Sequence, residues 1–152
     1  METIDSKNLD PQFKYDVAQH PGGDNIQLCF ACGTCTAACP VAEIDDQFNP
    51  RKIIRQVLLG MRKEVLSEST IWKCAQCYAC TAKCPQNVKF KDIIRALREM
   101  AVEEKYVEPD RGEKIEQIDK LWQKNRQNMI SVFLKNPEEF DKLKDKLERI
   151  TK

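Results

Sequence analysis

The sequence predicts an all-α fold built from two similar units, each a cysteine run followed by a helix, with a helical extension at the C-terminal end. Apolar residues recur at helical spacing after each run, and no segment shows the sustained alternation of a half-buried strand. Between Cys39 and Cys74 lie 34 residues. This spacer has room for a helix of about 16 residues and its connections, and it is too long for the small antiparallel sheets of short bacterial ferredoxins.

The helix after the first run is predicted to begin at residue 50. Asn49-Pro50 places a favoured N-cap residue before a proline at the first helical position. The apolar stripe that follows consists of Ile53, Ile54, Val57, Leu58, Met61 and Val65. We therefore expect one amphipathic helix over about residues 50–66.

The second half of the domain repeats this arrangement. Its apolar stripe consists of Ile93, Ile94, Leu97, Met100 and Ala101, and the tripeptide Ile53-Ile54-Arg55 recurs as Ile93-Ile94-Arg95. The cysteine runs are 45 residues apart and the stripes 40, so the first unit should hold five extra residues within 43–48. Two units are too few for a solenoid, and we expect a pseudo-symmetric pair.

The flanking segments are also expected to be helical. Asp10-Pro11 predicts the start of a short helix with Phe13 and Val17 on one face. After Pro109 the chain becomes very polar but keeps apolar residues at helical spacing: Ile115, Ile118, Leu121, Trp122, Met129, Val132 and Phe133. Asn136-Pro137 then opens a last helix whose face is Phe140, Leu143, Leu147 and Ile150.

The predicted organisation therefore has three parts: an N-terminal arm with a short helix (1–28), a helical domain that contains both cysteine runs (29–106) and a charged helical tail (107–152). The tail stripes either pack back on this helical domain or dock on a partner. Docking is favoured, because narrow stripes far from a small core suit it. With 41% apolar and 7% aromatic residues in 152, the core is thin, and bound groups should help to stabilise it.

Eight cysteines fall into two runs of the same form. Each reads C-x2-C-x2-C-x3-C-P, the spacing found in bacterial iron–sulfur proteins. Three thiolates at this spacing reach three corners of one cube, whereas the proline after the fourth cysteine turns the chain away, and in two-cluster proteins that cysteine binds the other cluster. We therefore predict two [4Fe-4S] clusters, the first bound by Cys29, Cys32, Cys35 and Cys84 and the second by Cys74, Cys77, Cys80 and Cys39.

Other roles for these cysteines fit less well. A structural zinc site uses two C-x2-C pairs, so the remaining cysteines of each run would be surplus to tetrahedral zinc. A thioredoxin-like site needs one such pair in a βαβ setting. A disulfide framework belongs to secreted proteins, and the N-terminus with Glu2 and Asp5 lacks the basic and apolar regions of a signal peptide.

Charge and hydropathy exclude further classes. The 25 basic and 24 acidic residues give a net charge of +1, which offers no argument for nucleic-acid binding. The longest apolar runs are far shorter than the roughly 20 residues of a membrane helix, so we expect no membrane span and a cytoplasmic location. Residues 51–105 nevertheless carry 12 basic residues against 6 acidic ones. This surplus either balances the negative clusters or reflects solvated helix faces.

Several residues beside the cysteines allow two interpretations. Phe30, Trp72 and Tyr78 either shield the clusters from water or pack in an ordinary core. Gly33 is expected to allow the backbone to approach the first cluster closely. His20 is expected to be a solvated loop residue, because the cysteines suffice as ligands.

Taken together, these residues resemble the C subunit of heterodisulfide reductase. The resemblance rests on the paired runs about 45 residues apart, on the segment 28–41 around the first run, on Ile71-Trp72-Lys73 before the second and on the Asp92-Ile93-Ile94-Arg95 helix. It covers about residues 13–104. It implies an α-helical ferredoxin fold, similar to the cluster domains of succinate dehydrogenase iron–sulfur subunits, with two [4Fe-4S] clusters.

The resemblance also implies a role in electron transfer. Electrons would come from the A subunit, which carries flavin and iron–sulfur groups, and pass to the catalytic B subunit, where the disulfide of coenzyme M and coenzyme B is reduced. The sequence itself has no spare thiol, no recognisable acid–base motif and no glycine-rich phosphate loop, so we expect a non-catalytic member of an oxidoreductase complex. The alternatives are an iron–sulfur subunit of a glycolate, lactate, glycerol-3-phosphate or succinate dehydrogenase complex, or a structural metal-binding module.

Overall fold

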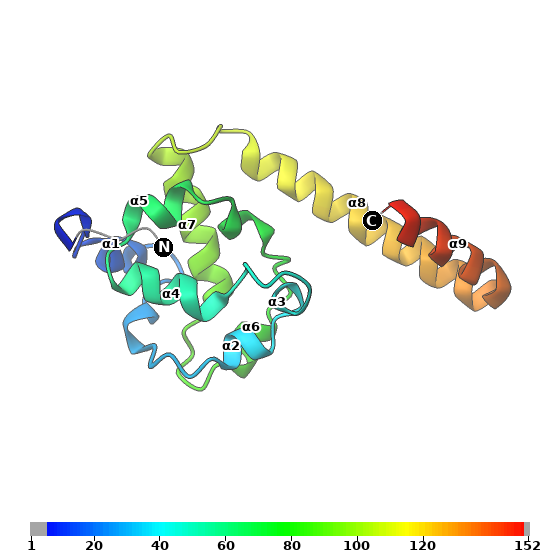
Figure 1. Cartoon of the computed structure of the whole chain (residues 1–152), viewed down its shortest axis with the longest axis horizontal. Coiled ribbons are helices and arrows are strands. Elements are labelled where there is room, and N and C mark those ends of the chain that lie inside the picture. The colour runs from blue at the N-terminus through cyan, green and yellow to red at the C-terminus, as the bar shows by residue number, and fades with distance from the viewer. Residues whose placement is uncertain (1–5, 151–152) are drawn as a thin grey trace. The chain divides into compact units, whose positions relative to one another are not determined.

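The described part of the chain is entirely helical in its regular structure (Figure 1). The computed structural model describes residues 6–150, without the side chain of Ile150. The all-α prediction is confirmed. By its internal contacts the chain divides into two compact units, Met1–Pro109 and Asp110–Lys152.

The core of the first unit lies between four helices: α1 (Phe13–Gln19), α4 (Pro50–Leu58), α5 (Arg62–Ser67) and α7 (Phe90–Glu103). Helix α7 contacts α1 and α5, and α4 contacts the same two helices. In Figure 1, α7 runs through the middle of this group. Phe13 and Val17 on α1 are fully buried, so the segment expected as an N-terminal arm contributes to the core.

The single helix predicted over residues 50–66 is wrong: the structure has α4 and α5 with a break between them. Gly60 lies at the break with a φ of +80°, a conformation that L side chains rarely adopt. Its carbonyl accepts a 2.7 Å hydrogen bond from the backbone N–H of Asp10. A Cβ at this position would stand 2.3 Å from the Asp10 carbonyl oxygen. The close approach of the N-terminal segment therefore requires the glycine and interrupts the helix.

An arginine on α5 fixes the N-terminal segment to this core. The Arg62 guanidinium contacts Asp10 at 2.9 Å, Asp16 at 2.6 Å and Glu104 at 2.7 Å. These three hydrogen-bonded carboxylates raise the arginine pKa further above its ordinary value. The guanidinium also lies over the Phe13 ring, 5.2 Å from its centroid. One cation thus connects α1, α5 and the end of α7.

The two cysteine runs form similar local structures. Short helix α2 (Thr34–Ala37) belongs to the first run and α6 (Ala79–Lys83) to the second, and the two helices contact each other. Helix α3 (Pro40–Ile44) follows the first run and has no counterpart in the second. This insertion accounts for extra residues that the sequence placed at 43–48.

The backbone strengthens the likeness between the runs. Ala31 and Gln76, 45 residues apart, both have positive φ, at 56° and 49°. Gly33 and Tyr78 do the same at the next equivalent position, at 86° and 63°. A Cβ on Gly33 would meet only ordinary contacts with Arg51, so its conformation, and not crowding by the chain, favours glycine there.

The second unit is a helical hairpin of α8 (Arg111–Lys135) and α9 (Pro137–Ile150), with Asn136 between them. The Phe133 and Phe140 rings meet edge to face beside this turn, with centroids 5.4 Å apart. Helix α9 begins where the Asn136-Pro137 signal predicted. None of the described helices has the length and apolar character needed to cross a membrane.

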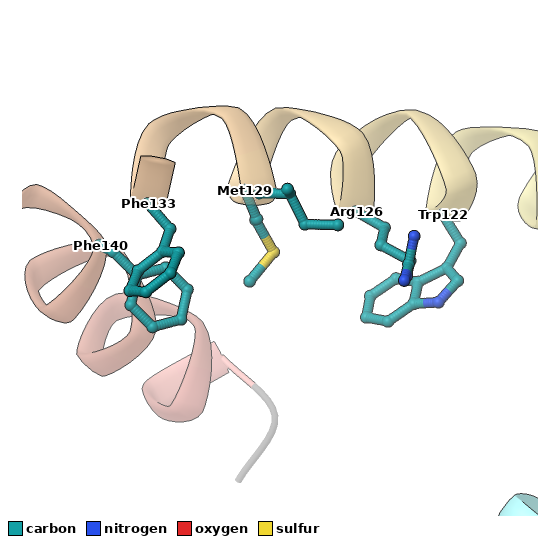
Figure 2. A pocket seen from close by; sticks show the side chains of 6 residues that line it. Trp122, Arg126, Met129, Phe133 and Phe140 are labelled. Atoms are coloured by element: carbon teal, nitrogen blue, oxygen red, sulfur yellow. The ribbon is translucent and has the colours of Figure 1, made fainter. Parts of the chain in front are cut away.

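One side of this hairpin is hollow and apolar. A groove of about 550 Å³ is lined by Trp122, Arg126, Met129, Ile130, Phe133 and Phe140. Figure 2 shows Trp122, Arg126, Met129 and Phe133 projecting from the same side of α8, with Phe140 meeting Phe133 from α9. No described residue of α8 or α9 is buried. The tail stripes predicted from the sequence therefore remain largely exposed within this unit.

Candidate iron–sulfur site

Four of the predicted ligands of the first cluster line a single pocket. Its walls carry Cys29, Cys32, Cys35 and Cys84, together with Cys80. The remaining wall includes Ile54, Val88 and Phe90, which are buried core residues. The fold thus brings Cys84 from the second run to the three leading cysteines of the first.

Local hydrogen bonds hold these thiols in place. The backbone N–H of Val88, just before α7, donates to the Cys84 sulfur at 3.4 Å. The Cys32 sulfur lies 3.3 Å from the Thr34 hydroxyl oxygen, and this contact lowers the pKa of the exposed Cys32 thiol. Burial raises the pKa of Cys35. Because a cluster ligand must be a thiolate, burial of Cys35 opposes ionisation until a metal binds.

The second predicted set also lies together. Cys39 directly precedes α3. The negative charges of Cys80 and Cys39 both raise the pKa of Cys74. The charge of Cys77 acts on Cys80 in turn. Burial is the largest cause that raises the pKa of Cys74 and of Cys80. Cys39 of the first run is therefore near enough to Cys74 for their charges to interact.

Cys35 of the first predicted set and Cys80 of the second lie where the two sets approach each other. They occupy equivalent positions on α2 and α6, the two short helices in contact. Cys80 belongs to the second predicted set but also lines the pocket of the first, and its charge acts on Cys35. Cys80 is 7% exposed, the lowest exposure among the eight cysteines. The inner edges of the two sets thus meet in the protein interior.

A buried arginine on α7 supports the second run. The Arg98 guanidinium donates to the carbonyl oxygens of Ile71 at 3.0 Å, Trp72 at 3.0 Å and Cys74 at 3.1 Å. It also lies over the Trp72 ring, 5.4 Å from the centroid. This cation lowers the pKa of Cys74, partly opposing the effect of burial. Arg98 was not predicted from the sequence, although its place beside Leu97 in the apolar stripe of α7 was a usable signal.

The aromatic residues beside the ligands divide between the two interpretations. Trp72 is buried, in agreement with core packing. Phe30 and Tyr78 are 60% and 53% exposed, so neither belongs to the core. Lys91 covers the Tyr78 ring at 4.7 Å. His20 is partly exposed and lies 3.5 Å from Glu99, away from the cysteines.

The donor set suits iron–sulfur clusters. All eight cysteines are free thiols, and soft thiolates favour such clusters. The four ligands of a cube bind four different irons, so they stand farther apart than the ligands of one ion. Within residues 6–150 no three histidine, cysteine or acidic side chains are close enough to hold a single metal ion.

Comparison with known proteins identifies the domain. Residues 25–88 match the family model of the 4Fe-4S dicluster domain, and this range contains all eight cysteines. This part of the chain is therefore similar to 4Fe-4S dicluster domains. The prediction of two [4Fe-4S] clusters is thereby confirmed, and the dicluster domain lies within the first structural unit.

Similar proteins agree with the resemblance found in the sequence. The chain is 35% identical over 102 residues to the C subunit of the H(2):CoB-CoM heterodisulfide,ferredoxin reductase of Methanothermobacter marburgensis, covering 67% of this chain and 54% of that protein. It is 42% identical over 79 residues to the C2 subunit of the H(2)/formate:CoB-CoM heterodisulfide,ferredoxin reductase of Methanococcus maripaludis, covering 52% and 42%. The C subunit of the ferredoxin:CoB-CoM heterodisulfide reductase of Methanosarcina acetivorans is 37% identical over 103 residues, covering 68% and 40%.

These relatives confirm the likeness to the C subunits of heterodisulfide reductases. The chain spans about half the length, or less, of the curated relatives it matches. The aligned 102 or 103 residues are too few to include both the dicluster domain and the whole hairpin tail.

Proposed function

We propose that this chain is a non-catalytic electron-transfer component of a heterodisulfide reductase-type complex. In this role it relays electrons from the flavin and iron–sulfur A subunit to the catalytic B subunit, which reduces the disulfide of coenzyme M and coenzyme B. The observation that supports the proposal is the contact between α2 and α6, the helices that carry Cys35 of the first predicted set and Cys80 of the second. The names of the similar proteins supply the type of complex.

The distribution of exposure suits a relay. When bound, [4Fe-4S] clusters supply reversible one-electron chemistry. Cys32 and Cys77, at equivalent positions in the two runs, are exposed, whereas Cys80 is buried between the sets. Each set therefore has one thiol at the protein surface and a side directed at the other set. In this role the chain holds the two groups close together, lines the first with the apolar side chains of Ile54, Val88 and Phe90, and leaves an exposed thiol in each set for a partner.

Two alternative functions share part of this arrangement. An iron–sulfur component of a hydroxy-acid or succinate dehydrogenase complex would use the same two-cluster relay with other partners. A structural metal-binding module would use the thiols without carrying current. The likeness to subunits of heterodisulfide reductases favours electron relay in a complex of that type over both alternatives.

Anaerobic reconstitution followed by redox titration tests the proposal. Each chain should bind about eight iron and eight sulfide, and the clusters should accept two electrons in separate steps with magnetically interacting reduced centres. The A and B subunits of a similar reductase should then bind the reconstituted chain and exchange electrons with it. Zinc, a single cluster, or two clusters that no reductant can reduce would contradict the relay. Reducible clusters that exchange electrons only with a hydroxy-acid or succinate dehydrogenase would favour the alternative complex.

A further inference from the structure

Helix α4 presents three exposed cations beside the first cysteine run. Arg51, Lys52 and Arg55 line a cavity of about 390 Å³ together with Ala31 and Asn49. Ala31 lies between Cys29 and Cys32, so the cavity opens at the exposed edge of the first ligand set. The helix is held there because the Thr36 hydroxyl of α2 donates to the Asn49 side chain at 3.0 Å. These cations are therefore fixed next to the thiols of the first run.

Intramolecular partners do not neutralise this charge. In the part of the chain that the structure describes, no carboxylate forms an ion pair with Arg51, Lys52 or Arg55. Exposed cations without a carboxylate partner are common on protein surfaces. Three such cations within five residues, at one edge of a predicted redox site, suggest a specific role if the equivalent site in the same chain has its cations paired with carboxylates.

The pseudo-repeat contains such an equivalent site. Forty residues later, Lys91 and Arg95 occupy the positions of Arg51 and Arg55. Lys91 lies 3.5 Å from Asp92, and Arg95 lies 3.7 Å from Glu99. In the first repeat, Lys52 and Leu59 occupy the positions of these two carboxylates. The second repeat thus pairs its cations with carboxylates of the same helix, α7. In the first repeat, neither carboxylate is present at the equivalent position of the sequence.

This difference argues against simple charge balance. Both runs offer four thiolates to the same kind of cluster, so both sites acquire the same negative charge when loaded. At the second site the buried Arg98 lies beside Cys74, while the equivalents of the α4 cations are paired with carboxylates. Compensation of the cluster charge therefore does not by itself call for three exposed cations without carboxylate partners at the first.

We propose that the α4 face formed by Arg51, Lys52 and Arg55 docks an acidic redox protein at the exposed edge of the first cluster. This inference rests on the proposed relay function. Phe30, which is 60% exposed, directly precedes Ala31 of this cavity in the chain and offers an exposed apolar side chain for such an interface. An apolar centre with a charged rim is the usual composition of a transient interface, and opposite charges accelerate the encounter.

The segment after Cys39 has the opposite charge. Glu43 and Asp46 are exposed there, and the Asp45 carboxylate is paired with Lys73 at 2.6 Å. Because Cys39 belongs to the second predicted set, an acidic partner is repelled from this side and attracted to α4. The segment after Cys39 and the α4 face thus differ in charge, and α4 is the more favourable surface for an acidic partner.

Electron transfer from an acidic flavodoxin provides the test. The reconstituted chain is compared with a triple variant, Arg51→Gln/Lys52→Gln/Arg55→Gln. A control triple variant, Lys14→Gln/Lys63→Gln/Lys105→Gln, makes the same change in net charge on α1, on α5 and just after α7. Stopped-flow absorbance follows the transfer of one electron from the flavin hydroquinone to an oxidised cluster, which leaves the flavin semiquinone. The midpoint potentials of both clusters are measured for all three proteins.

We expect the second-order rate constant of the wild type to fall as salt is raised, and the α4 variant to be about tenfold slower at low salt. The control variant should stay within about twofold of the wild type, and the midpoint potentials should be unchanged. Equal rate constants for the two variants would overturn the docking site. A shifted potential of the first cluster with a salt-independent rate would instead assign the cations to tuning the cluster.

Two further controls distinguish docking from nucleic-acid binding and from failure of the relay. Binding of a single-stranded DNA oligonucleotide to the wild type that the α4 variant loses, without a change in the flavodoxin rate, would assign the face to nucleic acid and refute the proposal. A neutral mediator is titrated in parallel. Clusters that the mediator reduces, but that show no dependence on α4, would refute the docking site alone. Clusters that neither carrier reduces would contradict the relay function itself.

Discussion

Replacement of Arg98 should weaken the second cysteine run specifically. Arg98 is 9% exposed, and its guanidinium donates three hydrogen bonds to carbonyls that precede or belong to this run. Arg98→Met keeps much of the apolar stem but leaves the carbonyl oxygens of Ile71, Trp72 and Cys74 without these donors. Arg98→Lys keeps the charge and loses the planar fork that reaches several acceptors at once.

The size of the effect follows from these contacts. A hydrogen bond from a charged donor contributes about 1.5–3 kcal/mol, which sets a gross loss of several kcal/mol for three bonds. Removing a buried cation also relieves its desolvation cost, so we expect a net loss of about 3 kcal/mol for Arg98→Met. For a domain of this size that corresponds to a fall in Tm of about 15 °C. Arg98→Lys should lose about half as much.

Two measurements on the reconstituted protein check this expectation. Circular dichroism at a fixed heating rate gives the apparent Tm, and EPR after partial reduction reports each cluster. The signal of the cluster bound by Cys74 should change in Arg98→Met, while the other signal keeps its shape. An unchanged Tm would refute the energetic argument. A change confined to the first cluster would refute the assignment of Arg98 to the second run.

Three further predictions concern ligation, backbone and tail. Cys84→Ser should alter the EPR signal of the cluster bound by the first run and Cys39→Ser that of the second, and the reverse pattern would show that each run binds its own cluster without crossing. Gly60→Ala should destabilise the protein by about 2 kcal/mol in thermal unfolding, because of its positive φ and the crowding there, whereas Gly112→Ala, with no neighbour within 4 Å, should not. Truncation after Pro109 should leave both clusters bound, since no described tail residue is buried, but weaken copurification with partner proteins. Loss of the clusters on truncation would mean that the tail belongs to the core.

The sequence sufficed where short-range chemistry determines structure. The Asn49 side chain caps α4 by accepting from the Lys52 N–H at 3.0 Å, as the Asn-Pro signal predicted. The spacing of the cysteines likewise grouped Cys84 with the first three cysteines, which line one pocket, because few chemistries use that run; which cysteine binds which cluster stays a prediction.

Contacts between residues distant in the sequence could not be predicted from the sequence. The apolar stripe over 50–66 continues through the break at Gly60, since Met61 and Val65 remain buried, and a stripe alone does not reveal that Asp10 requires the glycine. Likewise, a polar residue such as Arg98 at the edge of a stripe becomes informative only when its three acceptors are known. The burial of α1 depended on tertiary packing in the same way.

The ion pairs around Arg62 also constrain the order in which parts of the protein can fold. Its carboxylates come from Asp10, Asp16 and Glu104, so the contact closes a loop that includes nearly the whole first unit. Contacts between residues this distant in sequence form late, because the entropy of loop closure opposes them. During synthesis the first cysteine run leaves the ribosome well before residue 104. The eight thiols are therefore exposed to solvent oxidants and to free metal ions before the core closes, and this interval is when delivery of iron and sulfide by an assembly factor would matter most.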